Sequence, residues 1–331
     1  MSWQESETGR PAKWRRSRVA VLVLLITGLA TLAGGCSTIG EKEGIDLETG
    51  GEITAVTTTN FITDLVHQVG GDRVNVIGLM GAGVDPHLYK ASAGDVEDLR
   101  EADVIFYGGL LLEAKLEDVF EEVGETKPVF AVTARIPREK LLAAPSGAPA
   151  EEEFDPHVWF DVSLWKYAVE QVRDGLVEVD PDGESNYRAN ARRYLRRLEA
   201  LDREVARKLA TIPARQRVLV TSHDAFRYLG RRYDLDVAAI QGLSTAAEAT
   251  TDDIERIAEI IAKRGVNAVF VESSVPSQTI EAVLASARQQ GQDAMVGGEL
   301  YSDAAGEEGT PEGTYEGMLR SNVNHLVEGL G

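Results

Sequence analysis

The sequence predicts an α/β protein with two lobes, each a four-stranded, mostly parallel sheet covered by helices, joined by one long helix. Short β-rich runs alternate with helical periods from Gly51 onward, which is typical of parallel sheets covered by helices. This alternation occurs twice, before and after a segment, 184–210, that contains neither Gly nor Pro. The chain has 331 residues, which at about 150 residues per domain corresponds to two domains.

The elements follow in the same rhythm on both sides of the long segment. In the first lobe we expect strands near 52–57, 73–79, 104–107 and 129–132, with helices near 60–69, 93–101 and 112–123. In the second lobe we expect strands near 217–221, 236–240, 268–272 and 294–296, with helices near 225–232, 251–263, 277–290 and 314–328. The two halves repeat an architecture and not a residue pattern.

One apolar stripe runs along the segment between the lobes. Its members recur at helical spacing and are Tyr187, Tyr194, Leu198, Leu201, Val205 and Leu209. Basic residues on the other faces are interleaved with acids, which favours a solvated surface over a nucleic-acid or lipid site. A helix of about 27 residues spans roughly 40 Å and could run beside both lobes as a stiff connector.

The N-terminus has the pattern of an export signal. Basic residues at 13–18 precede an apolar run, 19–33, that ends in Gly34, Gly35 and Cys36. This run is shorter than the roughly 20 residues needed to span a bilayer. Its ending resembles a bacterial lipobox, which implies that Cys36 is acylated and becomes the first residue after cleavage. The expected division is a signal peptide at 1–35, a flexible tether at 36–50, a first lobe at 51–180, the connecting helix at 181–211 and a second lobe at 212–331.

The composition argues against some kinds of binding partner and some kinds of metal site. The chain has 34 Lys and Arg against 54 Asp and Glu, a net charge of −20, which argues against a nucleic-acid partner held by phosphate contacts. A single cysteine excludes an internal disulfide and a thiolate-rich metal cluster. An acidic surface remains compatible with collecting cations, and also with a saline habitat.

Three of the five histidines are placed like metal ligands. His87 and His157 each end an Asp-Pro-His run, and His223 follows the first strand of the second lobe, so all three are expected in loops. Loops beyond the carboxyl ends of parallel strands form the ligand crevice of such sheets. His67 and His325 fall inside helical periods and are expected to be packed or surface residues.

Three such ligands leave a tetrahedral ion one position short, which water or a carboxylate could fill. Asp303, in a loop after the last strand, is a candidate, and Glu299, Asp224 and Glu272 compete with it. Other aspartates could orient the imidazoles or serve as turn and helix-cap residues: Asp85, Asp155, Asp161 and Asp224.

Several runs together resemble the zinc- and manganese-binding lipoproteins of ABC transporters. They are Thr57-Thr58-Thr59, Gly71-Asp72-Arg73-Val74, the run from Leu79 to Tyr89, the run from Asp155 to Asp161, the run from Thr221 to Phe226 and the run from Gly297 to Asp303. The resemblance covers the chain from about Gly51 to its last residue. It implies a non-enzymatic, monomeric solute-binding protein of the cell envelope, in the periplasm or on the outer face of the cytoplasmic membrane. Such a protein delivers one ion from its cleft to a membrane permease.

Carried onto this sequence, the resemblance assigns His87 and His157 of the first lobe and His223 and Asp303 of the second as ligands. Three imidazoles and one carboxylate suit Zn²⁺, whereas Mn²⁺ prefers more oxygen. Relatives devoted to manganese commonly have glutamate at the position of His223, but the loop 138–154 lacks the histidines of many zinc-dedicated relatives. We therefore expect zinc first, then manganese or both, then iron.

Two other functions remain possible from the residues alone. An exported zinc hydrolase would need an exchangeable water and a general base such as Glu299 or Glu272, and a surface adhesin could carry an incidental ion. The chain contains neither an H-E-x-x-H run nor a G-x-S-x-G run, which disfavours the hydrolase.

Overall fold

A computed structural model describes residues 53–331. The expected signal peptide, the tether and Cys36 lie outside the described residues. Residues Glu48–Gly331 form one compact unit. Among residues 53–331, none of the helices is both long and apolar enough to cross a membrane.

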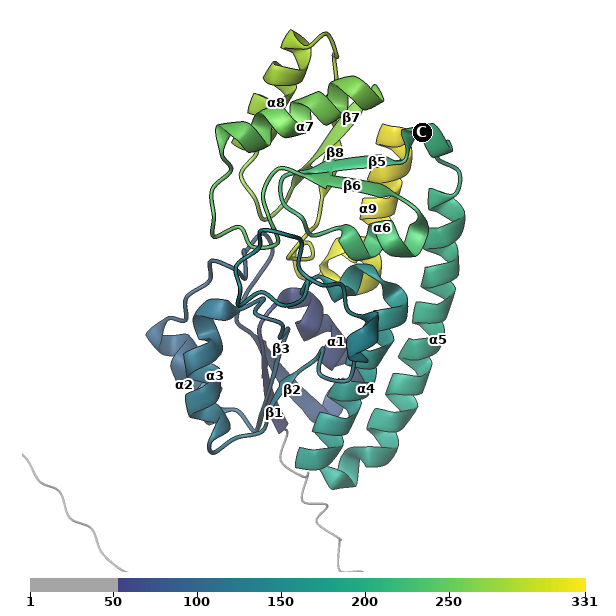
Figure 1. Cartoon of the computed structure of the whole chain (residues 1–331). Helices are drawn as coiled ribbons and strands as arrows, with labels where there is room; N and C mark the ends of the chain where they lie inside the picture. Colours follow the sequence, from purple (N-terminus) through teal and green to yellow (C-terminus); the bar gives the residue numbers. More distant parts are fainter. Residues whose placement is uncertain (1–52) are drawn as a thin grey trace, which may run out of the picture. The chain divides into compact units, whose positions relative to one another are not determined.

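The first lobe contains one parallel sheet, as expected (Figure 1). Its strands are β1 (Ile53–Thr57), β2 (Val74–Gly78), β3 (Val104–Tyr107) and β4 (Val129–Ala131), in the order β2-β1-β3-β4. Its helices are α1 (Asn60–Gly70), α2 (Ala93–Glu101), α3 (Glu117–Gly124) and α4 (Val162–Val179). The helix expected from residue 112 begins later, at Glu117, because residues Ala114–Leu116 form a 3-10 turn instead. Leu110 and Leu111, just before it, have positive φ values of 56° and 64°.

The second lobe has four strands but not the single sheet that the sequence predicted. β5 (Val218–Thr221) pairs in parallel with β6 (Asp236–Ala239), and β7 (Ala268–Glu272) pairs in parallel with β8 (Met295–Leu300). β5 and β7 are neighbours, but the two pairs run in different directions in Figure 1, so no ladder joins them within the described residues. The helices of this lobe are α6 (Arg227–Tyr233), α7 (Thr251–Arg264), α8 (Gln278–Gln289) and α9 (Tyr315–Leu330).

The last strand is longer than expected and continues through a glycine pair. The sequence prediction ended this strand at Val296, but β8 continues through Gly297 and Gly298 to Leu300. The pairing register with β7 shifts by one residue between Val296 and Gly298, which marks a β-bulge. A Cβ atom at Gly297 would lie 2.8 Å from the Ala268 Cβ atom, so the bulge needs glycine there.

The predicted long helix is α5 (Glu184–Leu209), and its whole apolar stripe is buried. α5 contacts α1 and α4 of the first lobe and α6 and α9 of the second (Figure 1). The sequence prediction contained no helix for α4, and this omission was wrong. The signals for α4 were present, since Asp161 caps its first turn by accepting from Ser163 N and buried residues recur along it at helical spacing.

Truncation of the α5 stripe should destabilise the whole described unit. We expect Leu201→Ala to lower the free energy of unfolding by about 2–5 kcal/mol, because Leu201 is fully buried between the lobes' helices. Urea denaturation followed by circular dichroism measures this loss. Arg203→Ala, at an exposed position of the same helix, is the control, and equal midpoints for the two variants would contradict the bracing role of the stripe.

Candidate metal centre

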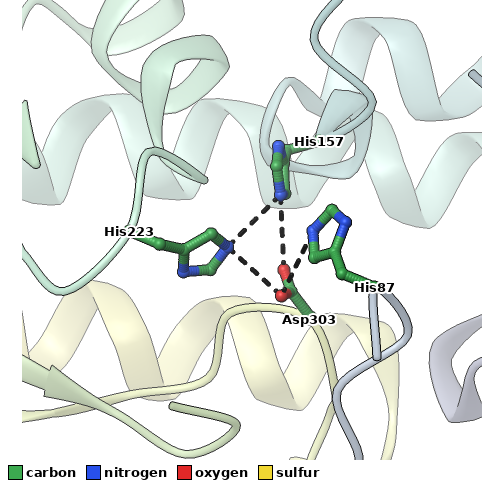
Figure 2. Close-up of side chains that lie close together, drawn as sticks. All are labelled: His87, His157, His223 and Asp303. Atoms are coloured by element: carbon green, nitrogen blue, oxygen red, sulfur yellow. Dashed lines mark hydrogen bonds and ion pairs between the residues drawn. The ribbon is translucent and has the colours of Figure 1, made fainter. Parts of the chain in front are cut away.

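Four loops bring His87, His157, His223 and Asp303 together (Figure 2). His87 follows β2, His157 precedes α4, His223 follows β5 and Asp303 follows β8. The possible ligand atoms of the four side chains all lie within 4.8 Å of one another. The two histidines of the first lobe therefore face the histidine and the aspartate of the second.

The spacing of the ligand atoms fits a tetrahedral ion. The Nε2 atom of His223 lies 3.4 Å from Nε2 of His157 and 3.2 Å from Oδ2 of Asp303. The Nε2 atoms of His157 and His87 lie 3.5 Å and 3.7 Å from Asp303 oxygens. A metal ion with ligand bonds of about 2.0–2.1 Å would hold neighbouring ligand atoms about 3.3 Å apart.

The four side chains are polar and buried, and two of them, His87 and Asp303, lack hydrogen-bond partners in the described part of the chain. His157, His223 and Asp303 are fully buried, and His87 is 4% exposed. Within residues 53–331, neither Asp303 oxygen nor Nε2 of His87 has a hydrogen-bond partner of acceptable geometry. Leaving such groups unpaired costs free energy, and a cation bound between them would satisfy all three atoms.

Carboxylates orient two of the imidazoles. Oδ1 of Asp155 lies 2.8 Å from Nδ1 of His157 and also accepts from the His157 backbone N–H at 3.0 Å. Glu272, at the end of β7, lies 2.5 Å from Nδ1 of His223 and accepts from the His223 backbone N–H at 2.9 Å. A carboxylate on the remote ring nitrogen fixes the tautomer and leaves Nε2 free to bind a metal.

Only part of this orienting set is predicted by the sequence. Of its four aspartates, only Asp155 contacts a ring; Asp161 caps α4, Asp85 caps the His87 turn, and the Asp224 carboxylate lies 3.7 Å from Arg227. Glu272, which the sequence offers as a competing ligand or a general base, instead uses both its oxygens to bind His223. Its position at the carboxyl end of a strand was the signal that could have found it.

The remaining competitors lie away from the ligand atoms. Glu299 is exposed on β8, and its carbonyl oxygen accepts from Nδ1 of His325 at 2.6 Å. His67 is exposed on α1. Neither helical histidine belongs to the cluster, as the sequence predicted.

The loop that carries Asp303 is held by the first lobe. Nε1 of Trp159 donates to the Ser302 carbonyl oxygen at 3.0 Å. On the other side of Asp303, the Asn60 side chain donates to the Ala305 carbonyl at 2.9 Å and accepts from the Ala305 N–H at 2.8 Å. Side chains of the first lobe thus hold the backbone on both sides of Asp303, and this keeps the Asp303 carboxylate facing the histidines.

Burial and charge set different protonation states for the histidines. Burial lowers the pKa of His87 to about 3, so His87 is neutral and ready to bind a metal. Burial alone would also lower the pKa of His223, but the carboxylates of Asp303 and Glu272 outweigh it and raise that pKa well above its ordinary value. Burial would raise the pKa of Asp303, yet the three histidines, His223 first, hold it far below its ordinary value.

Metal binding should therefore release a proton from His223. The raised pKa keeps His223 protonated at neutral pH without metal, and a cation can bind Nε2 only after this proton leaves. We expect release of about one proton per bound Zn²⁺, and an apparent affinity that falls about tenfold per unit decrease in pH near neutrality. Calorimetric titrations at one pH in two buffers of different ionisation enthalpy measure the proton count; buffer-independent heats would contradict this protonation state.

Loss of the Glu272 carboxylate should weaken the site without removing a ligand. We expect Glu272→Gln to reduce metal affinity by about 10- to 100-fold, because the His223 ring loses its charged acceptor. Competition against a chelator of known affinity measures the change. Glu299→Gln is the matched control on the exposed strand β8, and equal affinities of the two variants would exclude the orienting role.

Comparison with known proteins finds metal-binding relatives. The family model described as zinc-uptake complex component A periplasmic matches residues 55–329. The manganese-binding lipoprotein MntA of Bacillus subtilis is 44% identical over 89% of this chain and 94% of its own. The zinc-binding protein TroA of Treponema pallidum is 42% identical over 95% of this chain and 99% of its own.

A solved structure shares the fold. The periplasmic zinc-binding protein TroA of Treponema pallidum superposes with a TM-score of 0.81 at 44% sequence identity, covering 85% of this chain and all of that one. Neither the hydrolase nor the adhesin interpretation finds support among these relatives. The chain therefore belongs to the zinc-uptake component A family, the zinc- and manganese-binding, substrate-binding proteins of ABC transporters.

Proposed function

We propose that this protein captures one divalent transition-metal ion through His87, His157, His223 and Asp303 and hands it to an ABC permease for import. One observation carries the proposal: four buried side chains from both lobes converge, and the described residues give the Asp303 oxygens no hydrogen bond. The ligands differ in access to solvent, because only His87 borders a cavity of about 180 Å³, lined also by Leu110, Leu111, Phe154 and Leu243.

Zn²⁺ is the ion that we expect to bind most tightly. Three imidazoles and a carboxylate at tetrahedral spacing suit Zn²⁺, which lies above Mn²⁺ in the general order of affinity. Mn²⁺ can still be accommodated, since Oδ1 of Asp303 faces His157 while Oδ2 faces His87 and His223, so both oxygens can bind one ion. The relatives' names include both metals, manganese for MntA and zinc for TroA.

The site is suited to binding and release and not to turnover. Four protein ligands fill a tetrahedral ion, whereas a catalytic zinc keeps a position for water. Both oxygens of Glu272 are bound to His223, and Glu299 is exposed on β8, so neither carboxylate is placed to act as a general base. We infer that the protein has no hydrolytic activity.

The chain's export and division also belong to this proposal. Cleavage before Cys36 and its acylation would anchor a monomer at the outer face of the cytoplasmic membrane or in the periplasm, with 36–50 as the tether. The lobes would comprise 51–180 and 212–331. The connecting segment, 181–211, contains α5, whose contacts with both lobes support a stiff connector.

Removal of one ligand should separate specific binding from general cation binding. We expect chelator-stripped protein to bind one Zn²⁺ per chain, and His223→Ala to weaken that binding by at least about 100-fold, since it removes a ligand where loss of an orienting partner alone costs 10- to 100-fold. Competitive titration with Zn²⁺ and Mn²⁺ measures the affinities and their order.

His67→Ala is the matched control, because it removes an exposed histidine from α1. This variant should bind like the unmodified protein. A stoichiometry other than one, or equal weakening by the two substitutions, would refute the proposed site. Tighter binding of Mn²⁺ than Zn²⁺ would refute only the order of the metals.

A further inference from the structure

The two Asp-Pro-His runs form the same kind of turn, and each touches the opposite lobe. In both, Oδ1 of the aspartate accepts from the backbone N–H of the histidine two residues later, at 2.9 Å for Asp85 and 3.0 Å for Asp155. The proline disfavours a helical conformation of the aspartate and stiffens the turn. One carboxylate oxygen is thereby used to position the metal-ligating histidine.

The second oxygen of each aspartate faces a group of the second lobe. Thr245, in the loop after β6, donates its hydroxyl to Oδ2 of Asp85 at 2.5 Å. Arg227, the first residue of α6, reaches Oδ2 of Asp155 with a guanidinium nitrogen at 3.4 Å. Each aspartate therefore joins a first-lobe ligand to the second lobe.

The contact at Asp155 is reinforced by two adjacent residues of α6. Arg227 also donates to the Ala143 carbonyl at 3.0 Å. Tyr228 donates its hydroxyl to the Asp155 carbonyl at 3.0 Å and accepts from the Leu142 N–H at 2.9 Å. Because α6 begins only four residues after His223, the segment that supplies a second-lobe ligand also holds the turn of a first-lobe ligand.

We propose that Thr245 and Arg227 are positioning residues that couple lobe closure to the metal site through Asp85 and Asp155. Neither touches the ion; each holds an aspartate whose other oxygen fixes a ligating histidine. When the lobes separate, both contacts break and the His87 and His157 turns lose their second-lobe support. The metal should therefore leave faster from a protein that lacks either group. This inference rests on the proposed metal capture by the four ligands.

The test is the rate at which bound Zn²⁺ is released to excess chelator, followed by stopped flow. Thr245→Val removes the hydroxyl at nearly constant shape, and Arg227→Gln removes the charge. We expect each substitution to accelerate release about two- to tenfold, the range that loss of one hydrogen bond implies. Thr245→Ser and Arg227→Lys keep the donor or the charge and should restore slow release.

Matched controls remove the same groups elsewhere in the second lobe. Thr279→Val changes a hydroxyl on α8 that has no hydrogen-bond partner among the described residues, and Arg264→Gln breaks an exposed ion pair with Asp236. Release rates of Thr245→Val and Arg227→Gln equal to those of the controls would overturn the inference. Failure of Ser and Lys to restore slow release would overturn it as well, since a purely structural defect would persist in them.

The same measurements distinguish a failure of the proposed metal capture from a failure of the positioning role. If unmodified protein binds no Zn²⁺, or His223→Ala binds it equally well, the proposed function fails. If unmodified protein binds one ion that depends on His223, while Thr245 and Arg227 do not affect its release, only the positioning role fails.

Discussion

The burial of one carboxylate is the constraint on which the site depends. Asp303 is fully buried and accepts no well-formed hydrogen bond from the described residues, although His223 lies 3.2 Å away. An isolated buried charge is costly and must be paired. The carboxylates of Asp303 and Glu272 raise the pKa of His223, so a protonated His223 would supply that pairing without metal. A divalent cation at the proposed site would supply it once the proton has left.

Both lobes contribute to the surroundings of this carboxylate. Asp303 belongs to the second lobe, but Asn60 and Trp159 of the first lobe hold its loop through backbone hydrogen bonds. The His87 and His157 turns belong to the first lobe and contact the second. Because α5 packs on helices of both lobes, it keeps the lobes in the positions that these small contacts require. The compactness of Glu48–Gly331 as one unit is consistent with this mutual support.

Local signals in the sequence predicted most of the fold and the four side chains that converge. The α5 stripe and the loop positions of the three histidines depend on short-range patterns. Features that depend on distant pairing were missed: the bulge at Gly297, the separation of the second-lobe strands into two pairs, and the role of Glu272. Glu272 is 49 residues from His223, and no spacing rule connects them. α4 is different, because its signals were local and its omission was an error of interpretation.

In the proposed function, release of the ion depends on hydrogen bonds between the lobes that are individually weak. A hydrogen bond between the lobes contributes about 0.5–1.5 kcal/mol, so the loss of two such contacts shifts a closure equilibrium by about 5- to 150-fold. A wide rigid-body opening would disturb the packing of α5 against α1, α4 and α9, which buries a continuous apolar stripe. A small separation of the lobes at the ligand loops, enough to break the Asp85 and Asp155 contacts, therefore costs far less than a wide hinge. His87 is the natural place for such a movement, because it is the one ligand with measurable exposure and, within residues 53–331, no carboxylate holds its remote ring nitrogen.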